Sequence, residues 1–186
     1  MKKHFSFTLV ELLGAMALIV ILAGIAFSGY SYAMNKAKES ATTSTIKQIE
    51  TALNAAKIKA GYVPASSSYA VIKFTVDSAD LLEKIEFGST ELSASKNKKL
   101  FAEFKKIIDF EAIRQNLNDA GELADGFGGK IYYAFPGKIN KTGFDLVSAG
   151  ADGKFAKEDS GKPHNSSARS DYYDGNERIV DDISNF

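Results

Sequence analysis

The chain has 186 residues, a length typical of one folded domain with an appendage. Its residues are 45% hydrophobic and 25% charged, and this composition excludes wholesale disorder. Lysine plus arginine equals aspartate plus glutamate at 23 each, and this zero net charge argues against a nucleic-acid partner. The chain contains no cysteine, which excludes a disulfide scaffold and thiol chemistry.

A long apolar run lies near the N-terminus, from Phe7 to Phe27, and Glu11 is its one charged residue. A helix of this length extends about 31 Å, which matches a hydrocarbon core of about 30 Å. A short polar start, Met1 to His4, precedes the run. The run therefore predicts a segment that enters a membrane.

Three interpretations fit this run. A secretory signal peptide would be cut near Ala26-Phe27-Ser28, and a plain signal anchor needs only the apolar length. Neither explains Glu11, because a charged residue at the centre of a membrane helix costs about 2.5–3.5 kcal/mol. A filament subunit would gain from Glu11 if a neighbour supplied a positive charge, such as the amine created by cleavage before Phe7.

The junction Phe7-Thr8-Leu9-Val10-Glu11, followed by apolar residues from Leu12 to Phe27, resembles the processing signal of the type IV pilin and pseudopilin family. The resemblance implies that a prepilin peptidase cuts between Ser6 and Phe7 and methylates the Phe7 amine. Ser6 stands where the family usually has glycine. Glu11 would then pair with the Phe7 amine of a neighbouring subunit during assembly.

The same resemblance implies the organisation of the chain. It predicts a leader peptide at 1–6, a transmembrane and assembly helix at 7–28, an amphipathic continuation at 29–61 and a globular head at 62–186. The protein would cross the inner membrane once, with its C-terminal domain in the periplasm. Its partners would be the membrane, the prepilin peptidase, an inner-membrane assembly platform and other copies of itself in a helical filament.

A helical pattern continues past the apolar run. It forms an apolar stripe at spacings of three and four residues: Ile46, Ile49, Leu53, Ala56 and Ala60. Gly61 and Pro64 predict the end of this helix. One continuous helix of about 50 residues and a membrane anchor followed by a separate amphipathic helix both fit the pattern.

The segment 62–124 is expected to connect this helix to a sheet. Tyr69 to Val76 has the composition of a strand, residues 79–86 predict a helical turn, and the apolar spacing over 97–118 predicts an amphipathic helix. The last of these is most simply a packed helix with a solvated charged face.

From residue 125 to 186 the sequence predicts a C-terminal sheet with a long polar loop. The glycine-rich Asp125 to Gly129 predicts a turn into a strand at Lys130 to Phe135, and Phe144 to Ser148 predicts the next strand. With the resemblance, the expected fold is α+β and pilin-like, with a long N-terminal helix packed on a small antiparallel sheet.

A second resemblance lies in the C-terminal part. Ala149-Gly150-Ala151-Asp152-Gly153, together with Asp181-Asp182-Ile183, is similar to the calcium-binding segments of major pseudopilins of type II secretion. It implies that Asp152, Asp181 and Asp182 supply carboxylates to Ca²⁺, with backbone carbonyls near Ala149 and Ile179. Phe186 stands where the family has tryptophan. The residues alone favour a simple turn and a solvated acidic pair, and it is the resemblance that favours calcium.

No catalytic constellation is evident. His4 lies in the predicted leader and His164 in the polar loop, so neither has an acid–base partner, and we do not expect an enzyme. The resemblance favours a structural subunit of a type II secretion-like pseudopilus. A subunit of a type IV pilus or DNA-uptake filament is the alternative, and a membrane-tethered binding domain that never polymerises is an alternative of another class.

Overall fold

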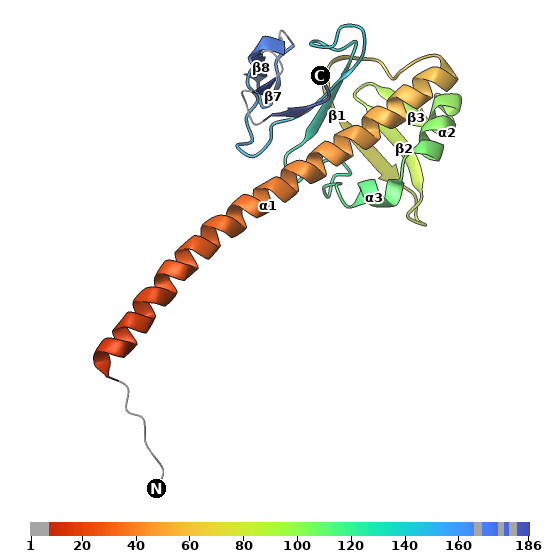
Figure 1. The fold of residues 1–186 in the computed structure, drawn as a ribbon. Coiled ribbons are helices and arrows are strands. Elements are labelled where there is room, and N and C mark those ends of the chain that lie inside the picture. Colours follow the sequence, from red (N-terminus) through yellow and green to blue (C-terminus); the bar gives the residue numbers. More distant parts are fainter. Residues whose placement is uncertain (1–7, 166–168, 175–176, 179–181) are drawn as a thin grey trace. The chain divides into compact units, whose positions relative to one another are not determined.

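The first helix, α1, extends without interruption from Leu9 to Ala60 (Figure 1). We describe a computed structural model of the protein at residues 8–165, 169–174, 177–178 and 182–186. The chain divides into two compact units, Met1–Ala37 and Lys38–Phe186, and α1 contributes to both. The helix ends where the glycine signal predicts, because Gly61 adopts φ +85° and its N–H donates to the Lys57 carbonyl at 2.9 Å.

In the described part of the second unit, six strands form one antiparallel sheet in the order β10-β5-β4-β1-β2-β3. Their bounds are Ser66–Val76 (β1), Leu82–Phe87 (β2), Thr90–Ser93 (β3), Ile131–Phe135 (β4), Asp145–Ser148 (β5) and Ile183–Ser184 (β10). The strands predicted at 130–135 and 144–148 are thus present as β4 and β5. The segment 62–124, expected as a connection, contributes β1, β2 and β3 to the sheet.

The remaining elements are short. Two helices follow β3, namely α2 (Lys98–Ile107) and α3 (Phe110–Arg114). The described part of the polar C-terminal loop contains two short antiparallel strand pairs and one 3₁₀ turn. These are β6 (Glu158–Asp159) with β7 (Lys162–Pro163), β8 (Tyr173–Asp174) with β9 (Glu177–Arg178), and η1 (Arg169–Asp171).

Two sequence predictions in the connection are wrong. Residues 79–86 do not form a helical turn, because Leu82, Ile85 and Phe87 are buried in β2 between β1 and β3. The single helix predicted over 97–118 is broken, because Ile108 is extended and the Asp109 side chain caps α3 by accepting from the Ala112 N–H at 3.2 Å.

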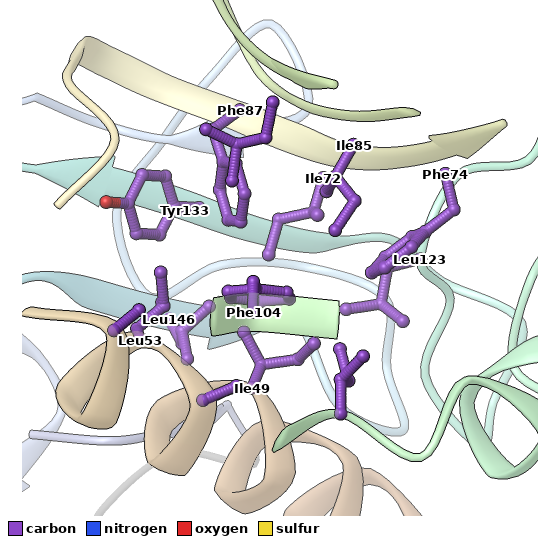
Figure 2. Packing of buried hydrophobic residues seen from close by; sticks show 14 of the residues in the cluster. Ile49, Leu53, Ile72, Phe74, Ile85, Phe87, Phe104, Leu123, Tyr133 and Leu146 are labelled. Carbon is purple, nitrogen blue, oxygen red and sulfur yellow. The ribbon is translucent and has the colours of Figure 1, made fainter. Parts of the chain in front are cut away.

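The expected fold class is confirmed, since the C-terminal part of α1 packs its apolar stripe on the sheet. Ile49 and Leu53 are fully buried against side chains from β1, β2, α2, β4 and β5 (Figure 2). Phe87 lies edge-on to both Phe104 and Tyr133, with ring centroids 5.8 and 4.9 Å apart. The core therefore joins α1, α2 and the sheet into one body within the second unit.

Four residues form polar contacts beside this core, and we call this group the threonine seam: Thr42, Thr45, Asn116 and Gly126. The Thr42 hydroxyl donates to the Lys38 carbonyl and accepts from the Gly126 N–H, both at 2.9 Å. The Thr45 hydroxyl accepts from the Asn116 side chain at 2.9 Å. A Cβ at position 126 would lie 2.4 Å from the Lys38 carbonyl oxygen, so only glycine permits this close approach.

Candidate processing, assembly and calcium sites

The described chain begins one residue before α1 with a reciprocal capping box. The Thr8 hydroxyl accepts from the Glu11 N–H at 3.2 Å, while the Glu11 carboxylate accepts from the Thr8 N–H at 2.9 Å and from its hydroxyl at 2.8 Å. The sequence places this box at the start of the apolar run because Thr and Glu stand three residues apart there. The Glu11 charge is thereby held at the positive end of the helix dipole.

The surface of α1 around and beyond Glu11 is apolar and exposed. Leu9, Leu12 and Leu13 are 74%, 59% and 57% exposed, and the large apolar side chains through Phe27 are similarly open. Among the described residues, α1 is the one helix long and apolar enough to cross a membrane. Because the apolar side chains of this segment are not buried within the protein, the segment is suited to contact lipid or other helices.

The predicted cleavage site, Ser6 and Phe7, lies outside the described residues. The described neighbour Thr8 belongs to the capping box, so the predicted new N-terminus is one residue away from the group that binds Glu11. The predicted amine is thus four positions before Glu11 in the sequence, and the pairing of Glu11 with a neighbour's amine remains a prediction.

The two segments predicted to bind calcium meet at one edge of the sheet. Ile183 pairs with Ser148 and Ser184 with Val147, so Asp182 and Ala149 follow as neighbours where β10 and β5 adjoin. Asp182 is 1% exposed, and its carboxylate accepts from the Ala156 N–H at 2.8 Å. Asp152 is exposed, and its carboxylate accepts from the Lys154 N–H at 2.8 Å.

The other predicted calcium ligands, Asp181 and Ile179, lie outside the described residues. Within the described ranges, no three histidine, cysteine, aspartate or glutamate side chains gather as a metal site. The donors available at this edge are carboxylate and backbone carbonyl oxygens, the type that Ca²⁺ prefers over transition metals. The donor chemistry fits calcium, and Asp182 holds the 149–156 loop directly.

Sequence reasoning missed a buried carboxylate that links this loop to α1. Asp125 accepts from the Phe127 and Gly129 N–H groups at 2.8 Å each and from the Ser148 hydroxyl, whose oxygen accepts from the Gly150 N–H at 3.1 Å. Gly126, next in the chain, reaches α1 through the threonine seam. The aspartate before a glycine-rich turn was the available signal, but its partner at Ser148 is distant in sequence.

A second missed carboxylate, Asp145, is fully buried at the start of β5. It accepts from the Tyr69 hydroxyl at 2.9 Å and from the backbone N–H groups of residues 138, 139 and 140 at 2.6, 2.9 and 2.9 Å. Burial, followed by the adjacent Asp145 charge, raises the pKa of Tyr69. Three of the four hydrogen bonds to the carboxylate thus hold the 136–143 turn, and the fourth joins it to Tyr69 on β1.

Comparison with known proteins concerns the N-terminal segment of the chain. Residues 1–27 match the family model described as the prokaryotic N-terminal methylation motif. No curated protein and no solved structure matches the chain significantly. The match covers the predicted leader, the capping box and the apolar run.

Proposed function

Because its N-terminal segment identifies the chain as a type IV pilin-like, prepilin-type protein, we propose that it is a structural subunit of a type II secretion-like pseudopilus. A prepilin peptidase processes such subunits, and their apolar N-terminal helix anchors them in a membrane. In our proposal the peptidase cuts between Ser6 and Phe7, the chain crosses the inner membrane once, and the head lies in the periplasm. An assembly platform then adds the subunit to a filament.

The observation that carries the filament role is the position of Glu11 within exposed apolar surface. Its carboxylate is satisfied by Thr8 of its own chain, which offsets part of the cost of keeping a charge in the membrane. In the filament, the methylated Phe7 amine of a neighbour would compete for this carboxylate. The attraction between two opposite charges in a low-dielectric core depends strongly on the distance between them. Pairing with the neighbour's amine would therefore let Glu11 set the register between subunits.

Exposed tyrosines support the predicted depth of the helix in the membrane. Tyr30 and Tyr32 are 65% and 68% exposed, and they follow the apolar run by one turn of α1. Tyrosine is enriched where membranes meet water, since its ring contacts lipid while its hydroxyl contacts water. We therefore place the periplasmic membrane surface at these two residues.

The processing and assembly roles are tested separately. Mass spectrometry of the membrane-extracted protein, with and without a co-expressed prepilin peptidase, should show a peptidase-dependent start at methylated Phe7. The Glu11→Ala variant should insert and be cut but yield at least tenfold fewer filaments, whereas Glu83→Ala, at an exposed position on β2, should assemble normally. Normal filament yield from Glu11→Ala would refute the charge-pairing role.

The resemblance of residues 149–153 and 181–183 to calcium-binding segments favours the secretion pseudopilus over a surface pilus. We propose that Asp152, Asp181 and Asp182, with carbonyls near Ala149 and Ile179, hold one structural Ca²⁺. The ion would supply positive charge that fastens the polar loop to the β5–β10 edge. Burial of Asp182 and its hydrogen bond to Ala156 support this, because both keep one carboxylate at that edge.

A further inference from the structure

Three large apolar side chains are exposed among the described residues of the second unit, and they lie in two separate places. Ile58 and Tyr62, at the end of α1, are 84% and 41% exposed, and Leu81, in the turn between β1 and β2, is 59% exposed. Single exposed apolar side chains are common on folded proteins, so the residues around them decide whether they form a contact surface.

The two places are separated along the direction of α1. The turn before β2 is joined to α3, because the Asp80 carboxylate lies 2.8 Å from the Arg114 guanidinium. The segment after α3 reaches an early part of α1, where Asn116 donates to the Thr45 hydroxyl at 2.9 Å (Figure 1). Ile58 follows Thr45 by thirteen residues of the same helix, or about 20 Å.

The apolar side chains at the end of α1 lie among positive charges. We call this surface the lysine end, and it comprises Lys57, Ile58, Lys59, Tyr62, Lys96, Lys98 and Lys99. The Tyr62 hydroxyl donates to the Asn97 side chain at 3.3 Å, which keeps the start of α2 beside the end of α1. Two of the five lysines pair with glutamates, at 3.0 and 3.3 Å, and the other three form no ion pair within the described ranges. The lysine end is therefore net positive.

Leu81 is held in place by its own turn. The Asp77 carboxylate accepts from the Leu81 N–H at 3.0 Å, and the Asp77 N–H donates to the Leu81 carbonyl at 2.9 Å. The turn therefore presents the Leu81 side chain to solvent without the entropy cost of ordering a free loop on binding.

Four acidic residues lie in this turn and at the start of α3. We call the surface that they form with Leu81 the acidic turn, and it comprises Asp77, Asp80, Leu81, Asp109 and Glu111. Two basic side chains lie beside it, namely Arg114 at Asp80 and Lys105, which donates to a backbone carbonyl of β2 at 3.3 Å. Lys47, near the start of α3, is ion-paired with Glu50 at 2.8 Å. The acidic turn is therefore net negative.

Each surface has an apolar centre with charged side chains around it, as specific interfaces do, and the two surfaces carry opposite charge. Copies that assemble through α1 are displaced along it, so contacts between them join different surfaces and do not close. We propose that the lysine end of one copy binds the acidic turn of a second copy in the filament, with Leu81 packed on Ile58 and Tyr62. This inference rests on the proposed filament function and adds a contact between heads to it.

Cysteine cross-linking tests the contact directly, since the natural chain has no cysteine. The full-length Ile58→Cys/Leu81→Cys variant would be assembled with its peptidase and assembly platform, and the filaments oxidised and run on a non-reducing gel. We expect dimers and higher ladders, because the two positions are too far apart to join within one chain. Either single-cysteine variant should remain monomeric. So should Lys141→Cys/Leu81→Cys, since Lys141 is exposed in the turn after β4 and belongs to neither surface.

A second measurement separates assembly from folding. Ile58→Asn should lower filament yield about tenfold, and Ile58→Leu should keep it, while the Tm of either detergent-extracted subunit changes by less than about 2 °C. Lys98→Glu/Lys99→Glu should lower the yield about threefold, whereas Lys141→Glu/Lys162→Glu, with the same change in net charge, should not.

The outcomes distinguish this contact from the filament function. Filaments that form without a 58–81 cross-link, or control variants that give the same ladders, would overturn the contact and leave the filament function intact. Normal filament yield from Ile58→Asn would also overturn the contact. Failure of the natural chain to form filaments would overturn both.

Discussion

The threonine seam gives the most direct test of how the head is held on α1. Thr42 is completely buried, and its hydroxyl both donates to the Lys38 carbonyl and accepts from the Gly126 N–H. Thr42→Val keeps the shape of the side chain but removes the hydroxyl. The Gly126 N–H, part-buried against Thr42, would then have no acceptor there, because the close approach to Lys38 leaves no room for rearrangement at that glycine.

The expected loss follows from that single unsatisfied donor. Leaving a buried donor without its partner costs about 1–3 kcal/mol, and loss of the local bond to Lys38 adds little because that carbonyl already belongs to the helix. For a protein of this size each kcal/mol lowers the Tm by about 2–4 °C. We therefore expect Thr42→Val to lower the Tm by about 2–12 °C.

The assay should compare neighbouring threonines. Thr43 is exposed and its hydroxyl donates only to the Glu39 carbonyl, so Thr43→Val makes the same chemical change without affecting the head. Urea unfolding followed by tyrosine fluorescence suits this chain, which has eight tyrosines and no tryptophan. Thr43→Val should change the unfolding free energy by less than about 0.5 kcal/mol. Equal stability of the two variants would show that the seam does not hold the head on α1.

Three further predictions concern the head. Asp145→Asn should lower the free energy of unfolding in urea by about 2–4 kcal/mol, because an amide cannot accept from all four donors around Asp145. A decrease in this free energy of less than about 1 kcal/mol would contradict the prediction. Chelation of calcium should lower the Tm of the natural protein but leave the Asp152→Asn/Asp182→Asn variant unaffected, and insensitivity of the natural protein would count against the metal site. Burial raises the pKa of Tyr69 and of Tyr133, so both hydroxyls stay protonated in the folded state at a pH where they ionise in the unfolded chain. The free energy of unfolding should therefore fall as the pH rises above about 10, the ordinary pKa of tyrosine. Tyrosinate absorbance from both residues before unfolding would refute this reasoning.

The sequence predicts the parts of this protein that depend on local pattern. The end of α1 at Gly61 and the strands β4 and β5 follow from apolar spacing and turn residues, which act within a few positions. The same pattern left open whether the helix before Gly61 is continuous, as it is in the structure. The prediction of a helical turn at 79–86 was wrong because the leucine, glutamate and lysine content of this segment favours helix. Pairing with β1 and β3 decided that segment, and this pairing is a tertiary effect that local propensity does not contain.

The candidate sites divide in the same way. Glu11 could be recognised because it is the one charged residue in the apolar run. Its capping box with Thr8 was not predicted, although a spacing of three residues was the available signal. Asp125, Asp145 and Thr42 could not, because their partners Ser148, Tyr69 and Gly126 are 23, 76 and 84 positions away. Such contacts become visible only when the chain is folded.

The two edges of the sheet have a consequence for how copies of this protein recognise one another. Within the described residues both edge strands are short, with β3 comprising Thr90–Ser93 and β10 comprising Ile183–Ser184, and α2 packs beside β3. A long bare edge would offer unpaired N–H and carbonyl groups to any strand that it met, including those of identical chains crowded in one membrane. Short edges remove that competing reaction, so a concentrated pool of subunits can stay unaggregated while α1 remains free to select its partners.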